Sequence, residues 1–175
     1  MPTSASRPRF ARNTARAAIA VIATLGLLAA GGCTPPPDSA PPPAAAPAKT
    51  PTEVAWKGYE EGLAEAKAAA KPVCLIFYTD WCPHCQNYHK VFLDPAVLAM
   101  SPKFVMIKLN KDKEPQLSEK YAPDGNYIPR TYFLKPDGTL MPEVTEQREQ
   151  YKYFYDESDP ASVLRSMKLV SEMKF

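Results

Sequence analysis

The sequence predicts an α/β fold in which a central mixed sheet of about four strands is flanked by helices. Short, almost wholly apolar runs at 73–78 and 104–109 alternate with helical patterns, as is typical of parallel strands joined by helices. The last apolar run is followed by Pro136-Asp137-Gly138, a turn that predicts an antiparallel hairpin. Parallel pairing first and a hairpin last make the expected sheet mixed.

The first expected element is a helix over residues 56–70. Tyr59, Leu63 and Ala66 are spaced by four and three residues, so they share one apolar face of this helix. Pro72 ends it, because the residue before a proline avoids the helical conformation.

A central strand and two helices are expected next. The run 73–78 is nearly all apolar, as in a strand that is covered on both faces. A helix then starts at Pro83, since proline is well tolerated in the first helical turn, and runs to Leu93. Asp94 is the expected N-cap of a short helix that ends at Met100.

The second half of the chain completes the sheet and adds a last helix. Asp159 is expected to cap that helix and Pro160 to begin it, with Val163, Leu164, Met167 and Val170 on its apolar face. The other expected elements are a strand at 104–109, a short helix at 116–120, a turn at 123–126, a strand at 131–134 and a hairpin strand at 139–144.

The amino-terminal 32 residues have the features of an export signal. Residues 1–16 carry four arginines and no acidic residue, and the apolar run 17–30 follows. This run is short for a membrane-spanning helix, which needs about 20 residues. The Ala30-Gly31-Gly32-Cys33 end resembles the lipobox of bacterial lipoproteins, which implies cleavage before Cys33 and acylation of that cysteine. The alternative is an ordinary signal peptide with a stray cysteine.

Three segments are therefore expected: a lipoprotein signal peptide (1–32), a lipidated Cys33 with a Pro/Ala-rich linker (33–51), and a folded domain (52–175). Eight of the residues 34–51 are proline, which favours an extended, semi-rigid linker. The expected location is the cell envelope, anchored by lipid and facing the periplasm. Thr34 after the lipidated cysteine, in place of aspartate, favours the outer membrane.

The charge of the folded domain gives no reason to expect nucleic acid as a partner. The whole chain has a net charge of +2, but five of its basic residues and one acidic residue precede residue 52. The domain then keeps 16 basic and 18 acidic residues, which is no basis for binding a polyanion.

The sequence Trp81-Cys82-Pro83-His84-Cys85 lies where the central strand gives way to a helix. Two cysteines separated by two residues can form a reversible disulfide, and a helix start favours a thiolate. We expect Cys82, with its sulfur facing solvent, to be the nucleophile and Cys85 to be the resolving cysteine. Pro83 and His84 are expected to tune the pair, and exposed Trp81 is expected to contact substrate, with simple packing as its alternative.

A metal site or a structural disulfide is the alternative use of these residues. Cys82, Cys85 and His89 have a spacing that could hold zinc or copper. No second Cys-x-x-Cys or obvious fourth ligand accompanies them, so we expect no metal and no cofactor. Cys74 lies inside the apolar run 73–78 and is expected to be a small buried hydrophobic residue.

The order of elements and the dithiol resemble the thioredoxin-like superfamily. The Cys-Pro-His-Cys string at 82–85 is similar to that of the oxidising bacterial periplasmic disulfide oxidase. Within the superfamily the chain resembles the anterior gradient group and its small thioredoxin-domain relatives of the endoplasmic reticulum, here as a bacterial lipoprotein. The segments that carry this resemblance are Trp56, 59–63, Lys71-Pro72, 82–84, 90–92 and 123–130.

The resemblance implies further site residues and also exposes departures. It implies a cis peptide bond between Ile128 and Pro129, opposite the dithiol, where both residues would bind an extended substrate; a trans proline is the alternative. Cys85 is intact, although anterior gradient proteins often have serine there. Reducing thioredoxins carry a buried aspartate at the place of Ile76, so efficient reduction is not implied. The chain ends in Met173-Lys174-Phe175, without a eukaryotic retention tail.

Together these observations predict a membrane-anchored thiol–disulfide oxidoreductase, closer to an oxidase or isomerase than to a reductase. Its expected partners are cysteine-containing exported proteins, a membrane redox partner, and the lipid bilayer through acylated Cys33. The alternatives are a reductase that serves cytochrome maturation, and a non-catalytic module that binds a client or a metal ion.

Overall fold

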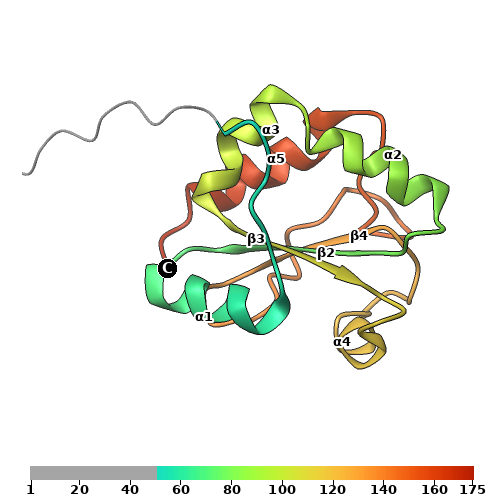
Figure 1. Cartoon of the computed structure of the whole chain (residues 1–175), viewed down its shortest axis with the longest axis horizontal. Coiled ribbons are helices and arrows are strands. Elements are labelled where there is room, and N and C mark those ends of the chain that lie inside the picture. The colour runs from blue at the N-terminus through green and yellow to red at the C-terminus, as the bar shows by residue number, and fades with distance from the viewer. Residues whose placement is uncertain (1–50) are drawn as a thin grey trace, which may run out of the picture. The chain divides into compact units, whose positions relative to one another are not determined.

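The computed structural model describes residues 51–175, which form a four-stranded sheet with helices on both faces (Figure 1). The strands are β1 (Trp56–Lys57), β2 (Val73–Tyr78), β3 (Val105–Asn110) and β4 (Arg130–Leu134), in the spatial order β1-β3-β2-β4. β3 runs parallel to both β1 and β2, whereas β4 is antiparallel to β2. The predicted α/β fold with a mixed sheet is confirmed.

The helices form two layers around this sheet. α2 (Pro83–Val91), α3 (Pro95–Met100) and α5 (Pro160–Ser171) lie on one side, and α1 (Tyr59–Ala69) and α4 (Pro115–Lys120) lie on the other (Figure 1). None of the helices in this part of the chain is both long and apolar enough to cross a membrane.

Two predicted helix starts are confirmed by their capping bonds. The Asp94 carboxylate accepts a hydrogen bond from the Ala96 N–H at 2.8 Å, and Asp159 accepts one from the Ala161 N–H at 2.9 Å. Such bonds satisfy N–H groups that have no partner within the helix. A 3-10 turn, Ser101–Lys103, follows α3 and leads into β3.

The central strand β2 is buried on both faces, as its composition predicts. Val73, Leu75 and Phe77 pack into the core on the α1 side, and Cys74 and Ile76 pack into the core on the α2 side. Each of these five side chains is at most 2% exposed. The dithiol helix therefore follows a strand that is firmly held in the sheet.

The α1 face is closely packed around a glycine that the sequence pattern did not single out. Gly62 and Ala66 are the buried residues of α1, whereas Tyr59 and Leu63 are only partly buried. A Cβ atom at Gly62 would lie 2.5 Å from two side-chain atoms of Ile107. Glycine therefore allows α1 to approach β3 closely.

The predicted start of the first helix and one predicted strand are wrong. Trp56 does not begin a helix but lies in β1, opposite Met106 of β3, and the helix begins only after Gly58. The predicted strand 139–144 is reduced to a single bridge between Leu140 and Leu134. Pro142 has no N–H with which to continue the ladder. The sheet thus has four strands because β1 joins it and the hairpin strand does not.

The predicted signal peptide (1–32), Cys33 and nearly all of the linker lie outside the described residues. These assignments stay predictions.

Candidate active site

The dithiol lies at the start of α2, directly after the carboxyl end of β2. Cys82 is the N-cap residue of α2, and its sulfur accepts a hydrogen bond from the Cys85 N–H at 3.4 Å. Pro83 occupies the first helical turn, as predicted. Both cysteines are free thiols. One turn of helix therefore brings both sulfurs to the same end of α2.

The Cys82 side chain is less open than the sequence led us to expect. Cys82 is 4% exposed and Cys85 is 7% exposed, so the expectation that the Cys82 sulfur faces solvent is wrong. Because this sulfur acts as the N-cap acceptor, the side chain turns back over the first turn of α2. A reacting molecule has to approach closely to reach it.

The two sulfurs differ in their environment. Burial, followed by hydrogen bonding with Cys82, raises the pKa of the Cys85 thiol to about 12, against smaller opposing effects of the Thr79 backbone and Lys108. Cys85 is thus protonated at neutral pH, which favours Cys82 as the attacking sulfur. Cys74 on β2 is fully buried, and burial raises its pKa strongly, as expected of an inert core thiol.

The loop before β4 brings the predicted proline to the dithiol. The peptide bond between Ile128 and Pro129 is cis, as predicted. Pro129 and Cys85 line the same small cavity below α2, although 44 residues separate them in the sequence. The first residue of β4, Arg130, pairs with Phe77 of β2, and this register sets the proline beside the end of β2. The role of both residues in substrate binding stays a prediction.

Trp81 is a surface side chain that is held by one polar contact. Its ring is 67% exposed, and its Nε1–H donates a hydrogen bond to Asp112 Oδ2 at 2.8 Å. Asp112 is itself oriented by Asn110, whose side-chain oxygen accepts from the Asp112 N–H at 2.9 Å. This exposure disfavours the packing alternative and leaves an apolar ring beside the dithiol.

His84 has a partner that the sequence did not indicate. Its Nδ1 lies 2.8 Å from Oε2 of Glu157, in the loop before α5. The imidazole also meets the ring of Phe154 edge-on, with 6.1 Å between the ring centres. A separation of 73 residues explains why no local pattern revealed this pair.

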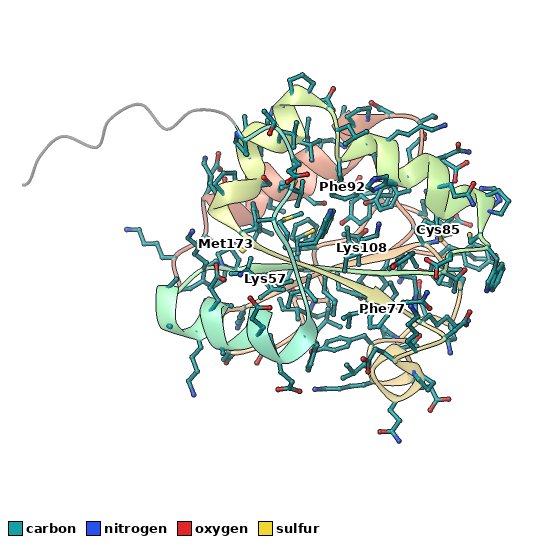
Figure 2. All side chains as sticks on the ribbon, in the orientation of Figure 1. Lys57, Phe77, Cys85, Phe92, Lys108 and Met173 are labelled. Carbon is teal, nitrogen blue, oxygen red and sulfur yellow. The ribbon has the colours of Figure 1, made fainter. Side chains whose placement is uncertain are left out.

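Lys108 is the second site residue that sequence reasoning missed. It lies on β3 directly opposite Ile76, and Figure 2 shows it with Cys85 on the α2 side of the sheet. Its ammonium lies 4.4 Å from the ring centre of Tyr78. Burial lowers the pKa of Lys108, whereas Cys85 and Asp80 oppose that shift. A single lysine inside an apolar strand was the signal that could have identified it.

Lys108 and Cys85 share a water-accessible cavity. The cavity has a volume of about 230 Å³, and Asp80, Gln86 and His89 are among its other lining residues. It provides a route by which a proton could leave the buried Cys85 thiol. Within residues 51–175, no group of three or more His, Cys, Asp or Glu side chains is arranged to hold a metal ion.

Comparisons with known proteins agree with this architecture. Residues 55–136 match a family model described as thioredoxin-like. The chain is 30% identical to anterior gradient protein 3 of Xenopus tropicalis over 118 residues, which cover 66% of this chain and 70% of that protein. It is 32% identical to the human anterior gradient protein 2 homolog over 63% of this chain, and it spans only 62% of that relative.

A solved structure extends the comparison to three dimensions. A thioredoxin from Thermus thermophilus superposes with a TM-score of 0.54 and 25% sequence identity, over 69% of this chain and 88% of the thioredoxin. The sheet order, the dithiol at the start of α2 and the cis-proline fit the same assignment. The chain therefore belongs to the thioredoxin-like superfamily and is a relative of the anterior gradient proteins.

Proposed function

We propose that this chain is a membrane-anchored thiol–disulfide oxidoreductase that acts on cysteines of exported proteins. The observation that carries the proposal is the pair of free thiols at the start of α2, with the Cys85 N–H bonded to the Cys82 sulfur and the cis-proline loop beside them. An exposed Trp81 and the Ile128–Pro129 backbone supply surfaces for an extended client.

In the oxidising direction, a client thiolate attacks Cys82 Sγ of the Cys82–Cys85 disulfide. The S–S bond breaks, Cys85 leaves and takes up a proton, and a mixed disulfide between the client and Cys82 remains. A second client thiolate then attacks the client sulfur of that mixed disulfide and releases the Cys82 thiolate. The client loses two electrons and gains a disulfide, and the protein is left as the dithiol, which a membrane redox partner reoxidises.

The apolar residue at position 76 favours the oxidase or isomerase reading over the reductase reading. In reduction, the protonated Cys85 thiol must lose its proton before it attacks the mixed disulfide. The position where a reducing thioredoxin carries a buried carboxylate is Ile76, which cannot accept this proton. The equilibrium redox potential separates the readings: an oxidase is expected near about −120 mV and a thioredoxin-type reductase near about −270 mV.

The test of the proposal is disulfide exchange by the purified full chain with a reduced, cysteine-containing client. Cys82→Ser should abolish exchange, and Cys85→Ser should trap the disulfide form of the client as a mixed disulfide, because Cys82 attacks the client disulfide and no resolving thiol remains. Cys74→Ala is the matched control, because Cys74 is a fully buried thiol away from the exchange steps, and it should retain exchange. Exchange at the wild-type rate in Cys82→Ser would refute the proposal, whereas retained metal without exchange would favour the binding-module alternative.

The anchor is a separate part of the proposal and has its own test. Cys33 after Ala30-Gly31-Gly32 is proposed to be acylated and to hold the domain at the envelope, facing the periplasm, with the outer membrane favoured. Cys33→Ala should move the chain from the membrane fraction to the soluble fraction without changing exchange by the dithiol. Membrane association that survives this substitution would refute the lipid anchor and leave the chemistry untouched.

A further inference from the structure

We propose that Glu157 is a positioning residue for the dithiol: it holds a proton on Nδ1 of His84, so that the ring exchanges its other proton at Nε2. The effect on Cys82 chemistry rests on the proposed function, whereas the proton position on His84 does not.

Each carboxylate oxygen of Glu157 has a partner on α2. Oε2 of Glu157 lies 2.8 Å from Nδ1 of His84, and Oε1 accepts a hydrogen bond from the Asn87 side-chain amide at 3.3 Å. His84 and Asn87 are both on α2. Glu157 is also the more buried partner: its side chain is 21% exposed, whereas that of His84 is 64% exposed.

The loop that carries Glu157 is tied to the start of α5. The Asp156 N–H donates to Ser162 Oγ at 2.9 Å, and the Asp156 carboxylate accepts from the Ser158 N–H at 2.8 Å. Asp159 then caps α5. These bonds lie on either side of Glu157, so its carboxylate has a fixed position from which to orient the imidazole.

The chemistry of the two groups decides where the proton resides. An ionised carboxylate accepts hydrogen bonds and cannot donate them, whereas a neutral imidazole carries one N–H and one lone pair. A hydrogen bond to Glu157 therefore requires the proton on Nδ1 whether the ring is neutral or charged. Nε2 becomes the ring nitrogen that is free to donate to, or accept from, a sulfur or client group at the site.

Nitrogen NMR of the purified full chain tests the proton position directly. The sequence has two histidines, so a His89→Gln variant assigns the His84 signals. At a pH where His84 is neutral, long-range proton–nitrogen correlations should identify the Nδ1–H form. Glu157→Ala should convert it mainly to the Nε2–H form, and Glu157→Gln, which preserves shape, should give a mixture. Glu172→Ala, the same loss of charge at the C-cap of α5, should leave His84 unchanged.

The reaction rate of reduced Cys82 with oxidised glutathione tests the consequence for the dithiol. Glu157→Ala should slow it severalfold, and His84→Ala should slow it at least as much. In the His84→Ala background the Glu157 substitution should have no further effect, because the two residues act as a unit.

The outcomes separate this inference from the proposed function. An Nε2–H form in the wild type, or a His84 signal that is indifferent to Glu157→Ala, overturns the positioning role. An equal rate loss in both backgrounds also overturns it, because Glu157 would then act without His84. An Nδ1–H form that depends on Glu157, in a chain that shows no disulfide exchange, supports the positioning contact and refutes the proposed function.

Discussion

Arg130 and Lys108 are two cationic residues on opposite faces of one sheet, and they differ in burial and in polar partners. The Arg130 side chain is fully buried, and its two terminal nitrogens donate to four acceptor atoms: the Tyr121, Gly125 and Ser118 carbonyls and the Ser118 hydroxyl. Lys108 is partly buried on the opposite face and, within residues 51–175, has no ion-pair partner. The Lys108 ammonium makes cation–π contacts with the rings of Tyr78 and Trp56.

The difference separates a structural cation from one that is available for chemistry. Arg130 binds neutral acceptors of the α4 region and of the loop before β4, so its charge organises the segment that leads to the cis-proline. Lys108 forms no ion pair within residues 51–175 and lines a cavity with Cys85 and Asp80, so a thiolate at Cys85 is an anion that it would stabilise. Three substitutions and one pH series test the roles of the two faces of the sheet.

Arg130→Met should have the largest effect, a loss of about 3–5 kcal/mol in the free energy of unfolding. The substitution leaves several buried acceptors without a hydrogen-bond donor, and each unpaired acceptor costs roughly 1–3 kcal/mol. Urea unfolding at pH 7 measures the loss. Lys108→Met is the comparison, and it should change stability by less than about 1 kcal/mol because an apolar side chain suits that position. Equal losses in the two variants would contradict the contrast.

Gly62→Ala should cost about 1–3 kcal/mol of stability, because a Cβ atom would overlap Ile107 on the closely packed α1 face. Gly58→Ala is the control, since nothing lies within 4 Å of a Cβ atom there. Thermal unfolding of both variants provides the measurement. The redox potential of either variant should match the wild type, and a shift in Gly62→Ala would show that the two faces of the sheet are coupled.

Lys108→Met should slow the resolution of a mixed disulfide by about tenfold, which corresponds to roughly 1.4 kcal/mol in the barrier. The ammonium favours the Cys85 thiolate that performs this step, and methionine does not. Stopped-flow release of a thiol from a preformed Cys82 adduct follows the rate. Lys111→Met, on the loop after β3, is a charge-matched control, and a similar loss in that variant would point to a general charge effect.

The last prediction concerns the pH dependence of the same step. Because the Cys85 pKa is raised to about 12, the attacking thiolate is scarce at neutral pH and becomes more abundant as the pH rises. The resolution rate should therefore increase from pH 7 to pH 10 without reaching a plateau. In Lys108→Met the profile should shift to higher pH. A plateau below pH 9 in the wild type would mean that another group removes the Cys85 proton.

Local patterns were sufficient for most elements of the fold. Asp94 and Asp159 correctly predicted the starts of two helices, because capping depends on neighbours only a few residues apart. The apolar run of β2 correctly predicted a strand that is covered on both faces. Trp56 was misassigned because it pairs with β3, a partner about 50 residues away in the sequence. The segment 139–144 was misassigned because Pro142 interrupts the hairpin after a single bridge.

The sequence by itself determined the dithiol and its position at a strand–helix junction, because spacing and residue type carry that information, and its resemblance to thioredoxin-like proteins implied the proline that faces the dithiol. Only the tertiary structure decided that the Cys82 sulfur is turned inward, that Glu157 meets His84, and that Lys108 shares a cavity with Cys85. For the last two contacts the physical reason is distance along the chain. Burial, ion pairing and proton affinity depend on residues brought together across 23 to 73 positions, and no local pattern encodes such contacts.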